Sequence, residues 1–295
     1  MNRILLLGGS GILGSEVLRK LNLEDMDYIA PLSSKLDVRN KASLQRYASD
    51  FKPNWIINCT AWTNVDGAED LFESALGLNE TAVRNIAEVA KQINCRVIHV
   101  STDYVFDGTS PEPYDESAQV KPLNKYGESK LRGEGELLRI IPEGAYIIRT
   151  SWLYGISGKN FVKTIAAKAV RKESAQVVDD QIGSPTSARD LARAIISITD
   201  SPPKPGIYNF SNKGICSWFE LACTIYRGVG ADPKLVEAID SSSLGLKAKR
   251  PKYSLLNKDK WESTGLSEIS EWKISLESIL PEILTEIQQS EPRCL

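Results

Sequence analysis

The stretch RILLLGGSGILG, residues 3–14, decides the fold of the N-terminal half. Its apolar run Arg3–Leu7 predicts a buried strand, and Gly11–Leu21 predicts the helix that follows. The glycines between them fit G-x-G-x-x-G from Gly9 and G-x-x-G-x-x-G from Gly8. Such a turn brings the backbone close to a pyrophosphate and aims the N–H groups of a helix N-terminus at it. A tight turn without a ligand is the competing interpretation, but the preceding strand and following helix favour a dinucleotide cofactor.

Strands and helices alternate along the rest of the first half. The predicted strands are Asp27–Ala30, Trp55–Cys59, Arg96–Ser101 and Ala145–Arg149, and the predicted helices are Lys41–Asp50, Leu71–Ile93 and Lys125–Leu138. Apolar strands that alternate with helices are typical of a parallel sheet covered on both faces, and right-handed crossovers make such a sheet doubly wound. We therefore predict an α/β protein with a Rossmann-type doubly wound parallel sheet.

The pattern loosens after about residue 150. The predicted helices there are Asn160–Val170, Ser187–Ile198 and Ser275–Gln288, and the predicted short strands are Gln176–Asp179 and Gly206–Phe210. We expect residues 1–150 to form an NAD(P)-binding Rossmann domain. Residues 151–295 should form predominantly a smaller mixed α/β substrate-binding lobe, some of whose segments return to the Rossmann domain.

Composition excludes several other classes of protein. The 295 residues include 36 basic and 38 acidic side chains, so the basic excess of a nucleic-acid-binding surface is missing. No apolar stretch approaches the roughly 20 residues of a membrane helix, and we expect a cytoplasmic protein.

The single histidine, His99, lies in an apolar run and is expected to be a buried strand residue. A catalytic triad that uses a histidine is therefore not expected. The cysteines are odd in number and lack a CxxC pair, so we expect reduced thiols and no metal site; they are Cys59, Cys95, Cys216, Cys223 and Cys294.

Tyr126 and Lys130 form Y-x-x-x-K at the start of a predicted helix, and of the ten tyrosines only this one has a lysine four residues later. That spacing puts both side chains on one helix face. A free tyrosine has a pKa of about 10, and proton transfer near neutrality favours a value nearer 7, a difference of roughly 4 kcal/mol. A positive charge about 4 Å away can supply that much at an effective dielectric near 20. We therefore expect Lys130 to lower the pKa of Tyr126, although an exposed surface pair is the alternative for an isolated motif.

Thr102 follows the fourth predicted strand, at the sheet edge where doubly wound proteins bind ligands. Its hydroxyl can bind the carbonyl oxygen of a substrate. A cap or turn is the ordinary role of threonine at a strand end, and the combination with Tyr126 favours chemistry.

The type of cofactor is indicated by the loop after the second predicted strand. NAD sites usually carry a carboxylate there for the ribose 2′-OH, but this loop contains Ser33, Ser34 and Lys35. Hydroxyls and a lysine suit a 2′-phosphate, so we expect NADPH and leave NADH open. Asp37 lies too far along the chain to be assigned to the ribose from its position alone.

These residues resemble the extended short-chain dehydrogenase/reductases, with Thr102, Tyr126 and Lys130 as the Ser/Thr-Tyr-Lys triad. Within that superfamily the chain is most similar to the dTDP-4-dehydrorhamnose reductase family. The resembling segments span most of the chain: Gly8–Gly14, Asn58–Glu69 (NCTAWTNVDGAE), Ser101–Gly108 (STDYVFDG), Tyr126–Glu134 (YGESKLRGE), Arg149–Tyr154 (RTSWLY), Asn160–Thr164 (NFVKT), Asp180–Thr186 (DQIGSPT) and Arg250–Pro251. The run Cys59-Thr60-Ala61 departs from the small residues usual in the family.

The resemblance implies reduction of the C4 keto group of a nucleotide-linked 4-keto-6-deoxyhexose in deoxysugar and cell-surface polysaccharide biosynthesis. Tyr126 would donate the proton, Lys130 would hold the nicotinamide ribose, and Thr102 would bind the carbonyl oxygen. The substrate-binding residues implied are Thr102, Asp103, Tyr104, Trp152, Asn160, Gln181 and Arg250, the last suited to pyrophosphate. With the glycine turn and the strand-end loop, the expected cofactor-binding residues are Gly8, Gly11, Ile12, Leu13, Gly14, Ser33, Ser34, Lys35, Asp37, Val38, Thr60, Ala61, Trp62, Tyr126 and Lys130.

Several alternatives stay open at this point. Trp152 could belong to the core, and Asn160 and Gln181 could be cap or turn residues. A dehydratase would need a second carboxylate beside Asp103, where this chain has Tyr104, whereas an epimerase would share the triad. A non-catalytic regulatory subunit, similar to that of methionine adenosyltransferase, would bind a partner enzyme instead. A homodimer is also left open.

Overall fold

The computed structural model describes residues 2–290. Its centre is a six-stranded sheet in the order β10-β5-β4-β3-β1-β2, with every neighbouring pair parallel. The strands are β1 (Arg3–Leu7), β2 (Asp27–Ile29), β3 (Trp55–Asn58), β4 (Arg96–Thr102), β5 (Ala145–Thr150) and β10 (Gly206–Asn209). The chain leaves β1 in one direction for β2 and returns on the other side for β3, so the reversal lies at β1, where doubly wound sheets bind ligands. The predicted α/β fold class is confirmed.

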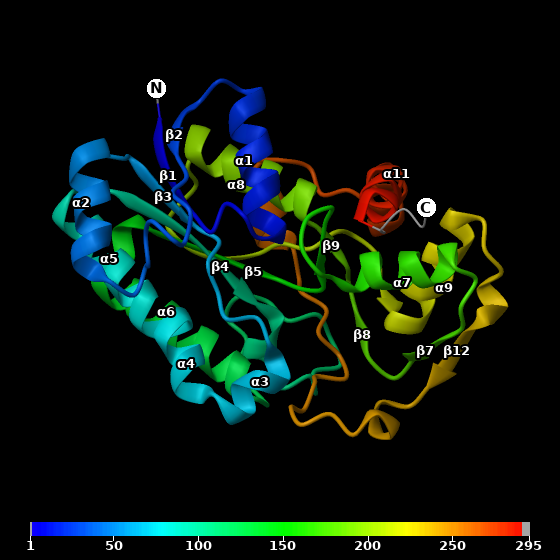
Figure 1. Ribbon diagram of the computed structural model, residues 1–295. Coiled ribbons are helices and arrows are strands. Elements are labelled where there is room, and N and C mark those ends of the chain that lie inside the picture. The colour runs from blue at the N-terminus through cyan, green and yellow to red at the C-terminus, as the bar shows by residue number, and fades with distance from the viewer. Residues whose placement is uncertain (1, 291–295) are drawn as a thin grey trace.

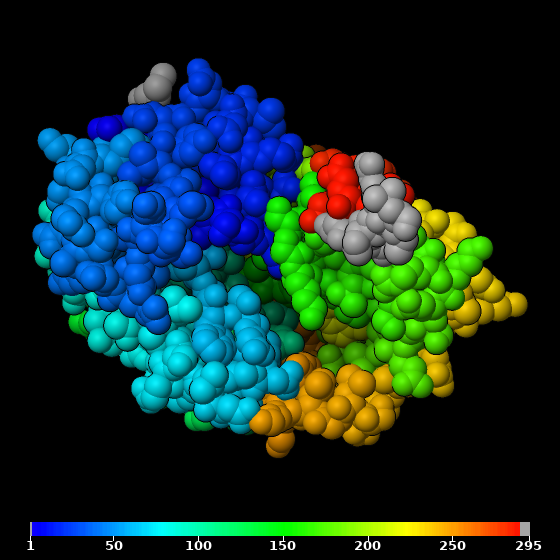
Figure 2. All heavy atoms as spheres, viewed as in Figure 1, coloured from blue at the N-terminus to red at the C-terminus, as the bar shows by residue number. Residues whose placement is uncertain are grey.

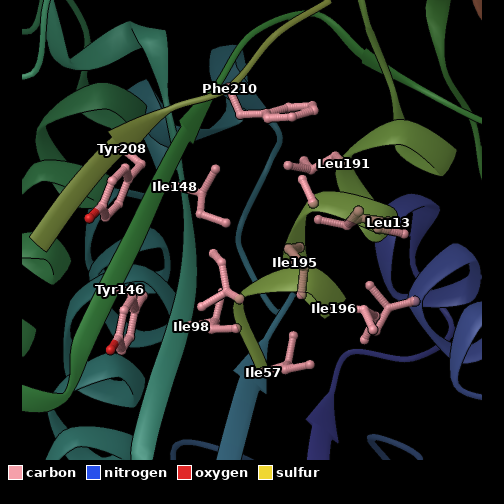
Figure 3. Packing of buried hydrophobic residues seen from close by; sticks show 14 of the residues in the cluster. Leu13, Ile57, Ile98, Tyr146, Ile148, Leu191, Ile195, Ile196, Tyr208 and Phe210 are labelled. Carbon is pink, nitrogen blue, oxygen red and sulfur yellow. The ribbon is translucent and has the colours of Figure 1, made fainter. Parts of the chain in front are cut away.

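Helices cover both faces of this sheet (Figure 1). One face carries α1 (Ile12–Leu23) and α8 (Ala188–Asp200), and the other carries α2 (Lys41–Phe51), α5 (Ala82–Gln92) and α6 (Lys125–Ile140). Figure 3 shows Ile57, Ile98 and Ile148, from three successive strands, pointing toward Leu191 and Ile195 of α8. Strands with both faces buried are predominantly apolar, which explains the apolar runs in the sequence.

Two segments of the second half join the first. Strand β10 pairs with β5, and α8 packs against α1. Trp261 of α10 (Asp259–Ser263) is buried in the same core. Residues well beyond 150 therefore contribute to the sheet and to the core that covers it.

The rest of the second half forms a smaller lobe with its own core (Figure 1). Its helices are α7 (Phe161–Val170), α9 (Trp218–Val229) and α11 (Trp272–Ser290). Its strands pair two by two: β7 (Ala175–Val178) with β12 (Val236–Ile239), β8 (Ile182–Gly183) with β11 (Cys216–Ser217), and β6 (Leu153–Tyr154) with β9 (Thr186–Ser187). Figure 2 shows the surface hollowed between this lobe and the N-terminal half.

The helix predicted over Leu71–Ile93 is interrupted. It consists of α4 (Phe72–Leu76), a π-helical turn η1 (Gly77–Thr81) and α5. The widened turn carries Asn79, whose side chain accepts from the N–H of Trp62 at 2.9 Å and donates to the hydroxyl of Ser129 at 2.8 Å. These bonds tie the turn to two neighbouring segments, and π-turns of this kind are frequent near functional sites.

Some elements were missed by the sequence prediction. They are α3 (Val65–Asp70), α9, α10, β12, the two-residue strands β6, β8, β9 and β11, and the short 3-10 turns η2 (Asp103–Val105), η3 (Pro142–Gly144), η4 (Pro233–Leu235) and η5 (Ser241–Leu244). Helix α9 did have a signal, because Ser217 and Glu220 form a complete capping box at its start.

His99 is fully buried in β4, as predicted. Within residues 2–290, Cys59, Cys95, Cys216 and Cys223 are free thiols, and Cys294 lies outside the described residues. Among these same residues, no helix combines the length and apolar character needed to cross a membrane. Nor do the described residues contain a group of three or more histidine, cysteine or carboxylate side chains that could hold a metal ion.

Candidate active site

The glycine turn after β1 is too tight for side chains at two positions. Gly8 has φ +81°, in the left-handed region, and a Cβ there would lie 2.9 Å from the backbone nitrogen of Thr60. A Cβ on Gly14 would lie 2.0 Å from the carbonyl oxygen of Gly8. Gly11 caps α1 without a side-chain hydrogen bond, so no capping side chain competes with an anion for the first N–H groups of the helix.

A cavity of about 740 Å³ opens in front of this turn. Its size fits a small-molecule or cofactor site, which typically measures roughly 300–1,000 Å³. The predicted cofactor residues that line it are Gly8, Gly11, Ser33, Ser34, Asp37, Val38, Thr60 and Ala61. The turn, the loop after β2 and the end of β3 thus meet around one cavity, because the strand order reverses at β1.

Other predicted cofactor residues do not line this cavity; they are Ile12, Leu13, Gly14, Lys35, Trp62, Tyr126 and Lys130. Leu13 belongs to the core, and Lys35 is exposed. Arg39, which the sequence analysis missed, does line it and donates to both carboxylate oxygens of Asp37, at 3.0 and 2.8 Å. These bonds lower the pKa of Asp37. The sequence did carry a signal for Arg39. The polar residues Asp37 and Arg39 alternate with the apolar residues Leu36 and Val38, which are buried, so Asp37 and Arg39 share the other side of the segment.

Thr102 and Tyr126 meet at the carboxyl end of β4. The hydroxyl of Tyr126 lies beside that of Thr102, and the Tyr126 ring packs edge-on against Tyr104 with centroids 5.7 Å apart. The Thr102 hydroxyl donates to Asp103 at 3.0 Å and accepts from the N–H of Tyr104 at 3.1 Å. The structure therefore brings together four residues that the sequence analysis assigned to catalysis or to substrate.

Asp103 is a buried carboxyl, only 2% exposed. Its Oδ2 has no hydrogen-bond partner among the described residues. Burial raises its pKa to about 6, against the opposing influence of the neighbouring hydroxyls of Ser254 and Thr102. This side chain can therefore change its protonation state near neutral pH.

Helix α6 presents Tyr126 because two glycines let it pack closely. Asn124 caps the helix by accepting from the N–H of Gly127 at 2.8 Å. A Cβ on Gly127 would lie 2.1 Å from the carbonyl oxygen of Tyr104, and one on Gly133 would lie 2.0 Å from that of Asn79. The glycines flanking Lys130 are thus packing positions that press the helix onto η2 and η1.

The expectation that Lys130 lowers the pKa of Tyr126 is wrong. Burial raises the pKa of Tyr126 to about 12, and the opposing influence is the neighbouring hydroxyl of Thr102. The ammonium nitrogen of Lys130, 1% exposed, lies instead against β4, where it donates to the carbonyl oxygen of Val100 at 2.6 Å. It also lies 3.2 Å from Nε2 of His99.

The residues expected to face the sugar nucleotide fall into two groups. Arg250 lies near Tyr104 and forms a two-pronged ion pair with Asp66, a residue that sequence reasoning did not assign. Trp152 adopts φ +48° and stacks on Trp218, also unassigned, with centroids 3.7 Å apart. A strained backbone at a non-glycine residue is common at ligand sites.

Asn160 and Gln181 are both buried. Asn160 caps α7, accepting from the N–H of Lys163 at 3.1 Å and donating to the carbonyl oxygen of Gly155 at 2.8 Å. A capping role, one of the two roles expected for Asn160, therefore explains both hydrogen bonds of its amide group. Gln181 lies one residue before β8.

Known proteins resemble this chain over nearly its whole length. The family model described as RmlD substrate binding domain matches residues 1–285. The dTDP-4-keto-6-deoxy-D-glucose reductase of Streptomyces niveus is 35% identical over 280 residues, 95% of this chain and 97% of that protein. The dTDP-4-dehydrorhamnose reductase of Mycobacterium tuberculosis is 35% identical over 283 residues, 94% of this chain and 92% of that protein.

Solved structures agree as well. The dTDP-4-dehydrorhamnose reductase of Bacillus anthracis, solved in complex with NADP, superposes with a TM-score of 0.91 at 36% identity, covering 95% of this chain and 99% of that one. The UDP-glucose 4-epimerase of Thermus thermophilus, at 16% identity and a TM-score of 0.82, shares the fold alone. The expected resemblance is confirmed: the chain belongs to the dTDP-4-dehydrorhamnose reductase family, that of the RmlD substrate binding domain.

Proposed function

We propose that this protein uses NADPH to reduce the C4 keto group of a dTDP-linked 4-keto-6-deoxyhexose, converting dTDP-4-dehydro-L-rhamnose to dTDP-L-rhamnose. The observation that carries the proposal is that the hydroxyls of Thr102 and Tyr126 are neighbours at the carboxyl end of β4. Two neighbouring hydroxyls can both bond to a single carbonyl oxygen placed between them. The names of the relatives support the choice of a dTDP-linked keto-sugar.

The residues around the 740 Å³ cavity fit a dinucleotide. Gly8 and Gly14 leave the turn without side chains, so a pyrophosphate can approach the backbone and the N-terminus of α1. Thr60 and Ala61 also line the cavity. When bound, the reduced nicotinamide supplies the hydride for the carbonyl carbon.

Tyr126 acts as the acid in this proposal. Reduction of a ketone needs a proton at the oxygen as the hydride reaches the carbon, so the competent form is the neutral phenol. A pKa raised to about 12 keeps Tyr126 protonated at neutral pH. The hydroxyl of Thr102 orients the carbonyl oxygen toward the phenol. The raised pKa therefore suits a reductase, and the phenolate required for the reverse oxidation is disfavoured.

Arg39 supports the preference for NADPH over NADH. Its guanidinium lines the cavity beside Ser33 and Ser34, and it is exposed enough to reach a 2′-phosphate. A charge-assisted hydrogen bond contributes about 1.5–3 kcal/mol. Arg39→Ala should therefore raise the KM for NADPH roughly tenfold or more and leave that for NADH nearly unchanged. An equal effect on both cofactors would contradict this role.

The sugar nucleotide would lie between the two halves of the chain, with residues 1–150 mainly holding the cofactor and residues 151–295 mainly holding the substrate. Arg250 is suited to bind the pyrophosphate, and this contact would replace part of its ion pair with Asp66. Trp152, supported from behind by Trp218, offers a flat apolar face to the hexose.

The decisive experiment follows NADPH oxidation at the nicotinamide absorbance, with dTDP-4-dehydro-L-rhamnose supplied. The wild type should consume one NADPH per sugar reduced. Tyr126→Phe, which keeps the ring and removes the acid, should lose at least about 100-fold in kcat. Lys130→Ala should also lose activity.

The same assay separates the competing functions. An epimerase would convert the sugar without net loss of NADPH. A regulatory subunit would leave the NADPH absorbance unchanged and bind a partner enzyme instead. A homodimer and a cytoplasmic location remain predictions, tested by light scattering and by cell fractionation.

A further inference from the structure

A short segment of the second half of the chain, residues 247–252, crosses to the N-terminal half beside the candidate active site; we call it the strap. At its end, the carbonyl oxygen of Lys252 accepts from the N–H of Ile182 in β8, at 2.8 Å. In its middle, the carbonyl oxygen of Lys249 accepts from the amide of Asn124, the N-cap of α6, at 2.8 Å. Figure 2 shows the orange part of the chain, which includes the strap, bridging the hollow between the two halves. The strap is therefore bonded to both sides of the cleft.

Asp66 of α3 holds the strap by its backbone and by a side chain. Its Oδ1 accepts from the N–H of Ala248 at 3.0 Å. Its two carboxylate oxygens accept from Nη1 and Nη2 of Arg250, at 3.2 and 2.5 Å. The hydrogen bonds from Arg250 hold the pKa of Asp66 below its usual value, so this carboxylate is charged at neutral pH. One carboxylate thus orients both the chain and the guanidinium.

These contacts leave one edge of the guanidinium for a ligand. Asp66 takes the edge formed by Nη1 and Nη2, and the other hydrogen of Nη1 is donated to the carbonyl oxygen of Ala248 at 2.8 Å. The donors that remain are Nε–H and the second hydrogen of Nη2, which lie on one edge and match two oxygens of a phosphate group. Arg250 itself lies near Tyr104, whose ring packs on that of Tyr126. The guanidinium is therefore close to the proposed acid.

Arg250 differs from the cations at the two ends of the strap in its burial. Its side chain is 18% exposed in the pair with Asp66. Lys247 and Lys252, which pair with acidic side chains of their own, are 62% and 72% exposed. A mostly buried guanidinium that is already held along one edge loses little side-chain freedom when it binds an anion.

We propose that Asp66 is a positioning residue that holds the guanidinium of Arg250 by one edge and presents the other edge to the diphosphate of the sugar nucleotide. A bound diphosphate loosens at most the Nη2 contact, while Nη1 keeps its bonds to Asp66 and Ala248. The charge of Asp66 repels an anion, but the guanidinium lies between the two. The inference rests on the proposed function only in assigning Arg250 to a diphosphate.

Asp66→Asn tests the inference with little change of shape. When the new amide oxygen accepts from Ala248, its NH₂ group takes the place of Oδ2 and faces Nη2 of Arg250, so two donors oppose one another. The measurement is the affinity for dTDP by isothermal titration calorimetry. We expect a loss of about tenfold, the effect of one charge-assisted hydrogen bond. The affinity for NADPH should stay unchanged, which also shows that the variant folds.

A double-variant cycle separates the guanidinium from the backbone contact. In an Arg250→Gln background, Asp66→Asn should have no further effect on dTDP affinity, whereas a role through the N–H of Ala248 alone would persist. In the reductase assay, Asp66→Asn should raise the KM for the sugar nucleotide about tenfold and leave kcat nearly unchanged. An equal loss of dTDP affinity with and without Arg250, or a loss confined to kcat, would overturn the inference.

Asp70→Asn is the matched control on the same helix. It removes the same charge from a contact with the strap, but its partner is Lys247 and both side chains are exposed. It should leave dTDP affinity unchanged. If repulsion by Asp66 dominated, Asp66→Asn would tighten dTDP binding, and that result would overturn the inference. So would a wild type that binds neither dTDP nor inorganic pyrophosphate.

Two provisions keep the test decisive. If Asp66→Asn does not fold, Asp66→Glu keeps the charge and displaces the guanidinium by one methylene, so dTDP affinity should fall; an unchanged affinity would contradict a positioning role. The binding measurement needs no reduction of a sugar. Weaker dTDP binding in the variant without sugar reduction by the wild type would refute the proposed function alone. Reduction by the wild type with an unchanged dTDP affinity in the variant would refute this inference alone.

Discussion

The ion pair between Glu134 of α6 and Arg149 of β5 should be a major contributor to stability. The two side chains are 2% and 3% exposed, and they share two hydrogen bonds, of 3.0 and 2.7 Å. Glu134→Gln keeps the shape but leaves the guanidinium charge buried and turns an amide NH₂ group toward one of its donors. Breaking a buried pair by removing one partner costs about 3–5 kcal/mol.

That cost can be converted into a melting temperature. An unfolding entropy of about 2.1 cal/mol/K per residue gives roughly 0.6 kcal/mol/K for this chain, so the melting temperature should fall by about 5–8 °C. Differential scanning calorimetry at neutral pH measures the fall.

The control is Glu136→Gln, two residues along the same helix. Glu136 pairs with Arg84 and Arg139, whose side chains are 38% and 64% exposed. Because exposed pairs contribute at most about 1 kcal/mol, its melting temperature should change by no more than about 2 °C. Equal losses in the two variants would refute the reasoning that burial makes the Glu134 pair costly to break.

Two further predictions concern the site itself. Gly14→Ala forces a Cβ toward the carbonyl oxygen of Gly8, 2.0 Å away, and overpacking of about 1–3 kcal/mol should weaken NADPH binding by about 5- to 150-fold in a fluorescence titration. Gly135→Ala, which meets no atom within 4 Å, should leave binding unchanged, and an unchanged affinity in Gly14→Ala would show that the turn is not needed. Asp103 has its pKa raised from 3.8 to about 6 by burial, so the stability it contributes is present below pH 3.8 and is lost as the pH rises through 6. Relative to the wild type, Asp103→Asn should therefore gain about 2.4 kcal/mol of stability between pH 4 and pH 7; a difference between the two proteins that does not vary with pH would contradict this.

Local sequence was sufficient for most of the sheet. The strands of the first half are predominantly apolar runs, because both faces of a parallel sheet are covered. The glycine turn was also predictable, because few backbone conformations can form it. Predictions were weaker where packing overrides local preference. The π-turn at Gly77–Thr81 depends on the hydrogen bonds of Asn79 with Trp62 and Ser129, which are distant from it in sequence.

The sequence by itself determined the family and the α/β fold, which depend on apolar runs and on motifs of fixed short spacing. It predicted Thr102 and Tyr126 as a pair through the resemblance to the family. Only the tertiary structure decided that Arg39 rather than Lys35 lines the cofactor cavity, and that Arg250 meets Asp66, 184 residues away. It also decided that Lys130 faces His99 and that the pKa of Tyr126 rises. The reason is physical: burial and charge pairing depend on which distant segments exclude water around a group, and no local pattern specifies them.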